Sequence, residues 1–229
     1  MLRLEPIIEL PPFQLGPGTP ARQPEEPFDA HWSRALAHAG VTGIAPRGAW
    51  HAALDDLVTA AAIELVLDMH FDRHRSRCVP EHYHPDGSIH DMVLAASPSE
   101  VADLVGPLEG GYELACDGAS LSFPGCCGDL ADLEEWEKVA TAPTEELSML
   151  WIGHPWHMVR LRDGLLEIHA ASESSCSPLI GRLDLPELRL AVRQAKDALG
   201  RFAERVAPVV RARFGDRKTA NVVRAMIRR

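Results

Sequence analysis

Several features that would assign a function directly are absent from this sequence. No apolar run approaches the ~20 residues that a membrane-spanning helix needs. The chain also has no P-loop, G-x-G-x-x-G, G-x-S-x-G or H-E-x-x-H motif, no set of protein-kinase motifs and no aromatic RNA-binding motif. The sequence therefore predicts no membrane association, and it gives little weight to nucleotide-dependent or common hydrolase chemistry.

Cysteine and lysine are both scarce. Five cysteines in 229 residues, an odd number, indicate reduced thiols rather than a disulfide framework. The first residues, Met1 to Pro6, include a proline and an acid where a signal peptide would have its apolar stretch. Both observations predict a cytoplasmic location. Only three of the 23 basic residues are lysine, which is typical of a GC-rich genome, and we expect a bacterial source.

Charge is distributed unevenly along the chain. The net charge is −10 at pH 7, but residues 182–229 contain 13 basic and 5 acidic residues and so carry +8, while the remainder carries −18. Two interpretations are open. The basic segment packs on the acidic body and offsets part of its charge, or the acidic body faces a basic partner, since complementary fields accelerate association. The acidic body argues against general nucleic-acid binding, although the basic segment alone could contact phosphates.

The composition, 46% hydrophobic and 24% charged, is that of a globular protein, and we expect three segments. Residues 1–28 contain many prolines and are predicted to form an extended leader. Residues 29–181 are predicted to form an acidic α+β body, and residues 182–229 a basic helical segment that packs on it. The predicted fold class is α+β: an antiparallel sheet built from hairpins, flanked by helices, with a long C-terminal helix.

Turn signals place the strands. Asp117-Gly118 predicts a hairpin over Tyr112–Phe123, and Asp163-Gly164 predicts a second hairpin that joins strands 156–162 and 165–170. Apolar residues alternate over 63–71, where only Val66 breaks the pattern, so we expect a half-buried strand there. Further strands are expected over 91–96 and 147–153, with loops over 72–90 and 172–178.

Capping signals place the helices. Asp184, Pro186 and Glu187 start the longest one, which carries an apolar seam from Leu188 to Val209. The seam indicates a core contact or, as the minority alternative, a homodimer through Leu188–Val206. Pro208 should kink or end this helix near Val206. Shorter helices are expected over 29–40, 49–61, 98–105 (capped by Ser97, with Glu100 closing the box) and 219–227, and after Asp129, where Leu130, Leu133 and Trp136 share a face.

The stretch Pro124-Gly125-Cys126-Cys127-Gly128-Asp129 is unusual because it places two cysteines between glycines. If the chain brings Cys127, His154 and Asp129 together, they could act as nucleophile, base and orienting carboxylate. The alternative is a tight turn in which the glycines supply a positive φ and the small cysteines pack beneath it. No spacing rule in the sequence decides between the two.

A histidine-rich segment offers zinc binding as a second chemistry. It has no C-x2-C pair, and its C-x3-H-x-H spacing is not a standard zinc pattern. The adjacent cysteines at 126 and 127 are not expected to bind one ion easily. The candidate zinc ligands are Cys78, His82, His84 and His90, joined by His70 and His74 if residues 63–71 are helical.

An aromatic turn and a nearby acidic helix predict a binding surface. Trp151 and Trp156 flank His154-Pro155, where the proline marks a sheet edge or bulge because it has no N–H to donate. Tryptophan is enriched in interface hot spots, so the candidate binding residues are Trp151, His154 and Trp156, together with Glu134 and Glu135. The alternative is that the tryptophans are core residues around a bulge.

These patterns favour a cytoplasmic, acidic binding or inhibitory protein that neutralises a basic protein partner. Size, acidity and the missing catalytic motifs give it the general character of immunity proteins and antitoxins, an analogy that no motif supports. The alternative is a small cysteine- or zinc-dependent enzyme that uses the Cys126-Cys127 loop with nearby histidines. The first function needs only a complementary surface, whereas the second needs residues that converge in the fold.

Overall fold

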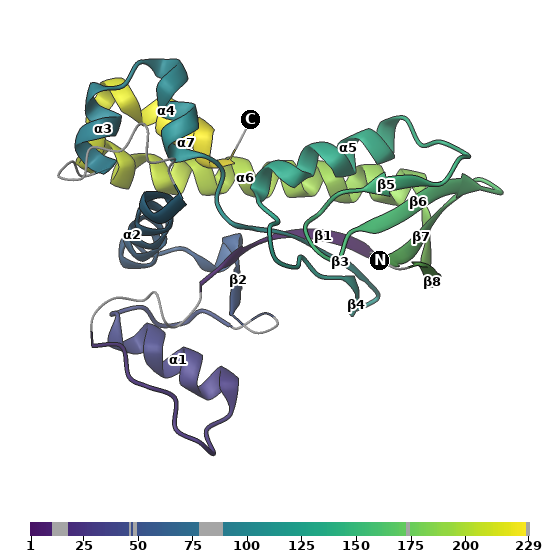
Figure 1. Cartoon of the computed structure of the whole chain (residues 1–229), viewed down its shortest axis with the longest axis horizontal. Coiled ribbons are helices and arrows are strands. Elements are labelled where there is room, and N and C mark those ends of the chain that lie inside the picture. Colours follow the sequence, from purple (N-terminus) through teal and green to yellow (C-terminus); the bar gives the residue numbers. More distant parts are fainter. Residues whose placement is uncertain (11–17, 46, 48–49, 78–88, 173–174, 228–229) are drawn as a thin grey trace. The chain divides into compact units, whose positions relative to one another are not determined.

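The computed structural model describes residues 1–10, 18–45, 47, 50–77, 89–172 and 175–227 (Figure 1). Its contacts form two compact units, each made of two stretches of chain. Both ends of the chain are divided between these units. The first unit contains Met1–Ile8 and Glu109–Leu199, and the second contains Glu9–Leu108 and Gly200–Arg229.

The N-terminal residues form strand β1 (Leu2–Glu9), which pairs antiparallel with β3 (Gly110–Cys116) so that Leu4 lies opposite Leu114. β3 continues into β4 (Ala119–Ser122) through a turn at Asp117 (φ 49°) and Gly118 (φ 84°). A two-residue turn with positive φ at both positions matches the twist of a hairpin, and the first predicted hairpin is confirmed. The sheet has the order β2-β1-β3-β4, where β2 is His51–Ala53.

A second antiparallel sheet, with the order β5-β6-β7-β8, lies within the first unit. Asp163 (φ 51°) and Gly164 (φ 78°) form the turn between β6 and β7, which confirms the second predicted hairpin. Part of the loop predicted over 172–178 is instead strand, because β8 begins at Ser175. The four strands are β5 (Ser148–Leu150), β6 (His157–Arg162), β7 (Leu165–Ser172) and β8 (Ser175–Asp184).

Two helices complete the first unit. The 3₁₀ turn η4 (Leu130–Asp132) leads into α5 (Leu133–Thr141), and the predicted face of Leu130, Leu133 and Trp136 is buried. The long helix α6 (Leu185–Phe214) begins where the Asp184 carboxylate accepts a hydrogen bond from the Glu187 N–H at 3.1 Å. Two antiparallel sheets, flanking helices and this long C-terminal helix confirm the α+β class.

The second unit is mainly helical. The Ser97 hydroxyl accepts a hydrogen bond from the Glu100 N–H, and the Glu100 carboxylate accepts one from the Ser97 N–H, so the predicted capping box is present. α6 runs through Pro208 and stops before Gly215 (φ 75°), so no helix end is found near Val206. No helix among the described residues is long and apolar enough to cross a membrane. The other elements are α1 (Phe28–His38), η2 (Leu54–Asp56), α2 (Ala60–Arg77), α3 (Ile89–Ala95), α4 (Pro98–Val105) and α7 (Asp216–Ile227).

The strand predicted over residues 63–71 is wrong, because these residues lie in α2. Ile63, Val66, Leu67 and His70 are buried, and their spacing of three, four and seven residues is the repeat of one helix face. Val66, which broke the apparent alternation, belongs to that face. Two other predictions for this unit are also wrong: residues 91–96 lie mostly in α3 rather than in a strand, and the described part of 49–61 contains β2 and η2 where one helix was expected.

Basic side chains of α6 form ion pairs within the unit to which they belong. In the second unit, Arg201 and Arg205 both reach Asp55. In the first unit, Lys196 pairs with Glu137. These ion pairs offset part of the charge of Asp55 and Glu137. The seam residues Leu188, Val192, Ala195, Leu199, Phe202 and Val206 are all buried within the single chain.

Candidate functional site

The loop that contains the two cysteines is held by main-chain hydrogen bonds on both sides. On one side, the Cys126 carbonyl accepts a hydrogen bond from the His154 N–H at 2.8 Å. On the other side, the Gly128 carbonyl accepts one from the Gly110 N–H at 3.0 Å. The loop thus lies between the start of β3 and the segment that joins β5 to β6, and these three stretches fix its backbone.

The glycines of this loop are required mainly by close packing. A Cβ atom on Gly125 would lie 1.6 Å from the His154 carbonyl oxygen, and one on Gly128 would lie 2.6 Å from the Gly110 carbonyl oxygen. Neither glycine has a positive φ, whereas Cys127 does, at 67°. The expectation that these glycines supply the positive φ is therefore wrong, and a cysteine occupies a backbone conformation that is uncommon for residues other than glycine.

The loop brings two thiols and an imidazole together. The Sγ atoms of Cys126 and Cys127 and one ring nitrogen of His154 all lie within 4.8 Å of one another. Both cysteines are exposed and His154 is half-buried. We call these three residues the Cys–His cluster. In this turn the side chains of both adjacent cysteines lie beside the same histidine.

Two tryptophans pack around the histidine of the cluster. The centroid of the His154 ring lies 4.9 Å from that of Trp151 and 5.4 Å from that of Trp156, edge to face in both cases. The two indole rings are stacked 6.1 Å apart. Both tryptophans are half-buried rather than core residues. Trp151, His154 and Trp156 therefore form one group, as a binding surface requires, whereas the other two predicted binding residues, Glu134 and Glu135, lie on α5.

The carboxyl groups next to the loop have a capping role. The Asp129 carboxylate accepts a hydrogen bond from the Ala131 N–H at 2.7 Å, and the Asp132 carboxyl accepts one from the Asp129 N–H at 3.0 Å. Together they form a capping box for η4. Of the predicted set Cys127, His154 and Asp129, the structure thus brings the first two together and uses the third as a cap. Asp132 is 9% exposed, and burial raises the pKa of its carboxyl to about 7.

The predicted zinc site falls largely outside the described residues, because Cys78, His82 and His84 belong to the segment 78–88. His90 is described, and its Nε2 donates to the Arg213 carbonyl at 2.7 Å. His70 lies in α2, where its Nε2 donates to the Val105 carbonyl at 2.7 Å. Each imidazole thus binds a main-chain carbonyl group within the second unit.

Sequence reasoning missed a buried pair in the first unit. The Ser122 Oγ lies 2.7 Å from the His157 Nε2, and both side chains are less than a tenth exposed. Burial lowers the pKa of His157. Its Nδ1 is buried without a hydrogen-bond partner among the described residues. The distance is that of a nucleophile and its base, but no carboxylate among the described residues orients the imidazole and both side chains are buried. We therefore assign the pair a structural role.

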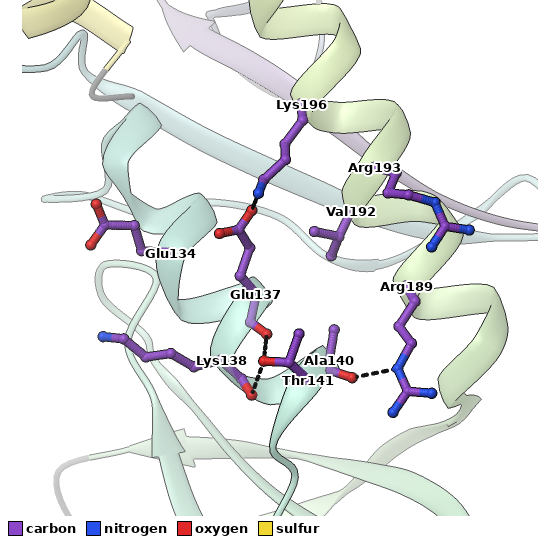
Figure 2. A pocket seen from close by; sticks show the side chains of 9 residues that line it. All are labelled: Glu134, Glu137, Lys138, Ala140, Thr141, Arg189, Val192, Arg193 and Lys196. Atoms are coloured by element: carbon purple, nitrogen blue, oxygen red, sulfur yellow. Dashed lines mark hydrogen bonds and ion pairs between the residues drawn. The ribbon is translucent and has the colours of Figure 1, made fainter.

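A groove of about 520 Å³ lies between α5 and the first half of α6 (Figure 2). We call it the α5–α6 groove. The basic composition of residues 182–229 was the only signal for it in the sequence. Its lining residues are Glu134, Glu137, Lys138, Ala140, Thr141, Arg189, Val192, Arg193 and Lys196.

Comparison with known proteins adds no assignment to this geometry. No protein-family model matches the chain, and no curated protein or solved structure is significantly similar to it.

Proposed function

We propose that this protein binds one thiophilic metal ion, with zinc as the expected occupant, through Cys126, Cys127 and His154. The observation that supports the proposal is the convergence of two thiols and an imidazole within 4.8 Å on a loop whose backbone is fixed on both sides. Thiolate and imidazole are the ligands that zinc takes most often in proteins. Soft thiolates also select against magnesium and calcium, which prefer oxygen.

The dimensions of the cluster suit one ion after a small adjustment. Zinc lies about 2.3 Å from a thiolate sulfur, so two thiolates on one tetrahedral ion lie about 3.8 Å apart. The three ligand atoms of the cluster lie within 4.8 Å of one another, and rotation of the exposed cysteine side chains would bring them onto one ion. The packing of Trp151 and Trp156 against His154 would hold the imidazole in place while the thiolates close on the ion.

The number of ligands also supports the enzyme alternative of the sequence analysis. Structural zinc sites are usually closed by four protein ligands, whereas catalytic sites keep three and leave the fourth position to water or substrate. Among the residues that the structure describes, the Cys–His cluster has three members. Zinc bound there would polarise a ligand in the open position or lower the pKa of a bound water. We therefore propose a zinc-dependent function with an open coordination position.

A metal titration of the reduced, metal-free protein tests the proposal. We expect one Zn²⁺ per chain, and one Co²⁺ with the charge-transfer absorption of cobalt bound to thiolate. Cys126→Ser and His154→Gln should each weaken binding more than about 100-fold, because loss of a group that merely orients a ligand already costs about 10–100-fold. Cys127→Ser should behave in the same way.

Two control variants make this titration specific. Cys116→Ser removes a half-buried thiol of β3 outside the cluster and should leave the affinity unchanged. Cys78→Ser removes a ligand of the rival site formed by Cys78, His82, His84 and His90. Absence of bound metal, or loss of binding in Cys78→Ser with full binding in Cys126→Ser, would overturn the proposal.

The second candidate is the acidic binding or inhibitory protein, immunity-like or antitoxin-like and cytoplasmic, that engages a basic protein. It is supported by the pair of half-exposed tryptophans around His154, because partly exposed indoles in a compact group are typical of interface anchors. Glu134 and Glu135 would supply a charged rim. We expect partner affinity to fall steeply with salt and to be lost in Trp156→Ala. A salt-independent interaction that survives Trp156→Ala would count against this candidate.

Self-association through Leu188–Val206 is a separate proposal. The seam is buried within the single chain, so a homodimer would have to take these side chains out of their own core. Sedimentation at several protein concentrations tests it, and a monomer throughout would exclude the dimer.

A further inference from the structure

The α5–α6 groove is cationic in a protein that is acidic overall. Its lining contains four basic side chains, Lys138, Arg189, Arg193 and Lys196, and two acidic ones, whereas the whole chain carries −10. The volume of about 520 Å³ lies in the range of about 300–1,000 Å³ that is typical of small-molecule sites. The groove lies entirely within the first unit and does not include any member of the Cys–His cluster.

Arg189 is fixed in place and has free donors. Its Nε donates to the Ala140 carbonyl at 2.8 Å, near the end of α5, and this bond sets the direction of the guanidinium (Figure 2). The four N–H groups on its terminal nitrogens donate to no acceptor among the described residues. A guanidinium held in this way presents a planar fork that matches the two oxygens of a carboxylate or phosphate.

Arg193 lies one helical turn further along α6 on the same side of the groove, as Figure 2 shows. In the part of the chain that the structure describes, it forms neither an ion pair nor a hydrogen bond. Like charges four residues apart on a helix repel each other. An anion between the two guanidinium groups would remove that repulsion.

The other basic side chains of the groove already have carboxylate partners. Lys196 pairs with Glu137, and Lys138 pairs with Glu135 on α5. Glu134, the second acidic lining residue, leaves α5 on the side away from the two arginines (Figure 2). The positive charge without a carboxylate partner is therefore concentrated at Arg189 and Arg193.

We infer that the α5–α6 groove binds a small multivalent anion, one that carries phosphate groups or several carboxylates, with Arg189 and Arg193 as its direct contacts. Lys196 and Lys138 contribute longer-range attraction. The apolar groups of Val192 and Ala140 form the floor against which the body of the ligand lies. This inference is independent of the proposed metal site.

Calorimetric titration of the full-length protein with inorganic phosphate, pyrophosphate and citrate tests the inference. We expect saturable binding of pyrophosphate, citrate or both, with one site per chain and an affinity that falls as salt is raised. Binding of pyrophosphate alone identifies a phosphate-bearing ligand, and binding of citrate alone identifies a polycarboxylate. Absence of binding by all three anions at millimolar concentration would overturn the inference.

Matched variants separate the groove from general charge. Arg193→Gln should weaken binding at least tenfold and should fold normally, because Arg193 forms no polar contact with described residues. Arg189→Lys keeps the charge but loses the planar fork, and it should also weaken binding. Arg162→Gln makes the same change at an exposed arginine of β6 and should leave the affinity within a factor of two. Equal losses in Arg162→Gln and Arg193→Gln would indicate general attraction and would refute the site.

Discussion

The buried carboxyl of Asp132 should make the stability of the protein depend on pH in an unusual direction. Asp132 lies at the end of η4, is 9% exposed, and accepts one hydrogen bond from the Asp129 N–H. Burial raises its pKa from 3.8 to about 7, since the charged form loses its water. The repulsion of Asp129 and Glu135 acts in the same direction.

The sign and size of the effect follow from this shift. The folded state binds the Asp132 proton more tightly than the unfolded chain does. The contribution of this proton to the free energy of unfolding is therefore fully present below pH 3.8 and is lost as the pH rises to about 7. A shift of about three units, at about 1.36 kcal/mol each, corresponds to at most about 4 kcal/mol. Above pH 7 the destabilisation that results from the ionised Asp132 carboxylate no longer changes with pH.

The substitution Asp132→Asn isolates this contribution. Asparagine keeps an oxygen that can accept the Asp129 N–H, but it does not titrate. Urea unfolding of the variant and the wild type at pH 4, 5, 6, 7 and 8 should show a growing advantage of the variant, up to about 1.4 kcal/mol per pH unit between pH 4 and 7. The lowered pKa of His157 affects the stability of both proteins equally, so it cancels in the difference between their free energies of unfolding.

Asp163→Asn is the matched control, since it makes the same chemical change at an exposed turn residue with φ 51°. The difference between Asp163→Asn and wild type over the same pH range serves as the baseline for the comparison. If the difference between Asp132→Asn and wild type is flat from pH 4 to 8, the carboxyl is not held neutral by burial and the reasoning fails.

Three other substitutions test the packing and the charges. Gly125→Ala should lower the free energy of unfolding by about 3 kcal/mol or more and abolish metal binding, because the new Cβ would overlap the His154 carbonyl. Its control is Gly181→Ala, whose Cβ would lie 3.5 Å from Leu121 and which should lower the free energy of unfolding by less than about 1 kcal/mol. Thermal unfolding of both variants measures the difference. Ser97→Ala should cost about 1 kcal/mol in urea unfolding through loss of the capping box, and no change would mean that the cap does not hold α4. Arg160 and Arg182 bind the Glu167 carboxylate and lower its pKa to about 2. The contribution of this carboxylate to the free energy of unfolding of the wild type is therefore present above pH 4.5 and is lost as the pH falls toward 2. Glu167→Gln should be less stable than wild type at pH 7 and should lack this acid dependence, and a parallel pH profile would contradict the assignment.

Local signals predicted the parts of the fold that depend on neighbouring residues. Both Asp-Gly turns form hairpins, because two consecutive positive φ angles specify the turn independently of the rest of the chain. The caps at Ser97 and Asp184 start helices for a similar reason, since each side chain satisfies an N–H within three residues. These signals required no knowledge of the tertiary structure.

The sequence predictions failed where burial in the tertiary structure, rather than the local sequence, determines the conformation. Residues 63–71 satisfied a strand pattern with one exception, and only burial of Val66 on the inner face of α2 identifies the helical repeat. The Cys–His cluster could be suspected from residue types but could not be assembled, because the pairing of Cys126 with His154 joins two loops far apart in sequence. The role of Gly125 depends on the backbone that it touches, which no local pattern contains.

The division of the chain has a consequence for how the protein can be cut. Each unit takes residues from two separate stretches, and α6 passes from one unit to the other within an unbroken helix, between Leu199 and Gly200. No single peptide bond therefore separates the two units. Removal of β1 would take a strand from the middle of a sheet, and truncation within α6 would remove core residues such as Phe202 and Val206. A fragment that ends at any single cut between the two units should therefore be insoluble or sensitive to proteases. Engineered versions of the protein need both units in one continuous polypeptide.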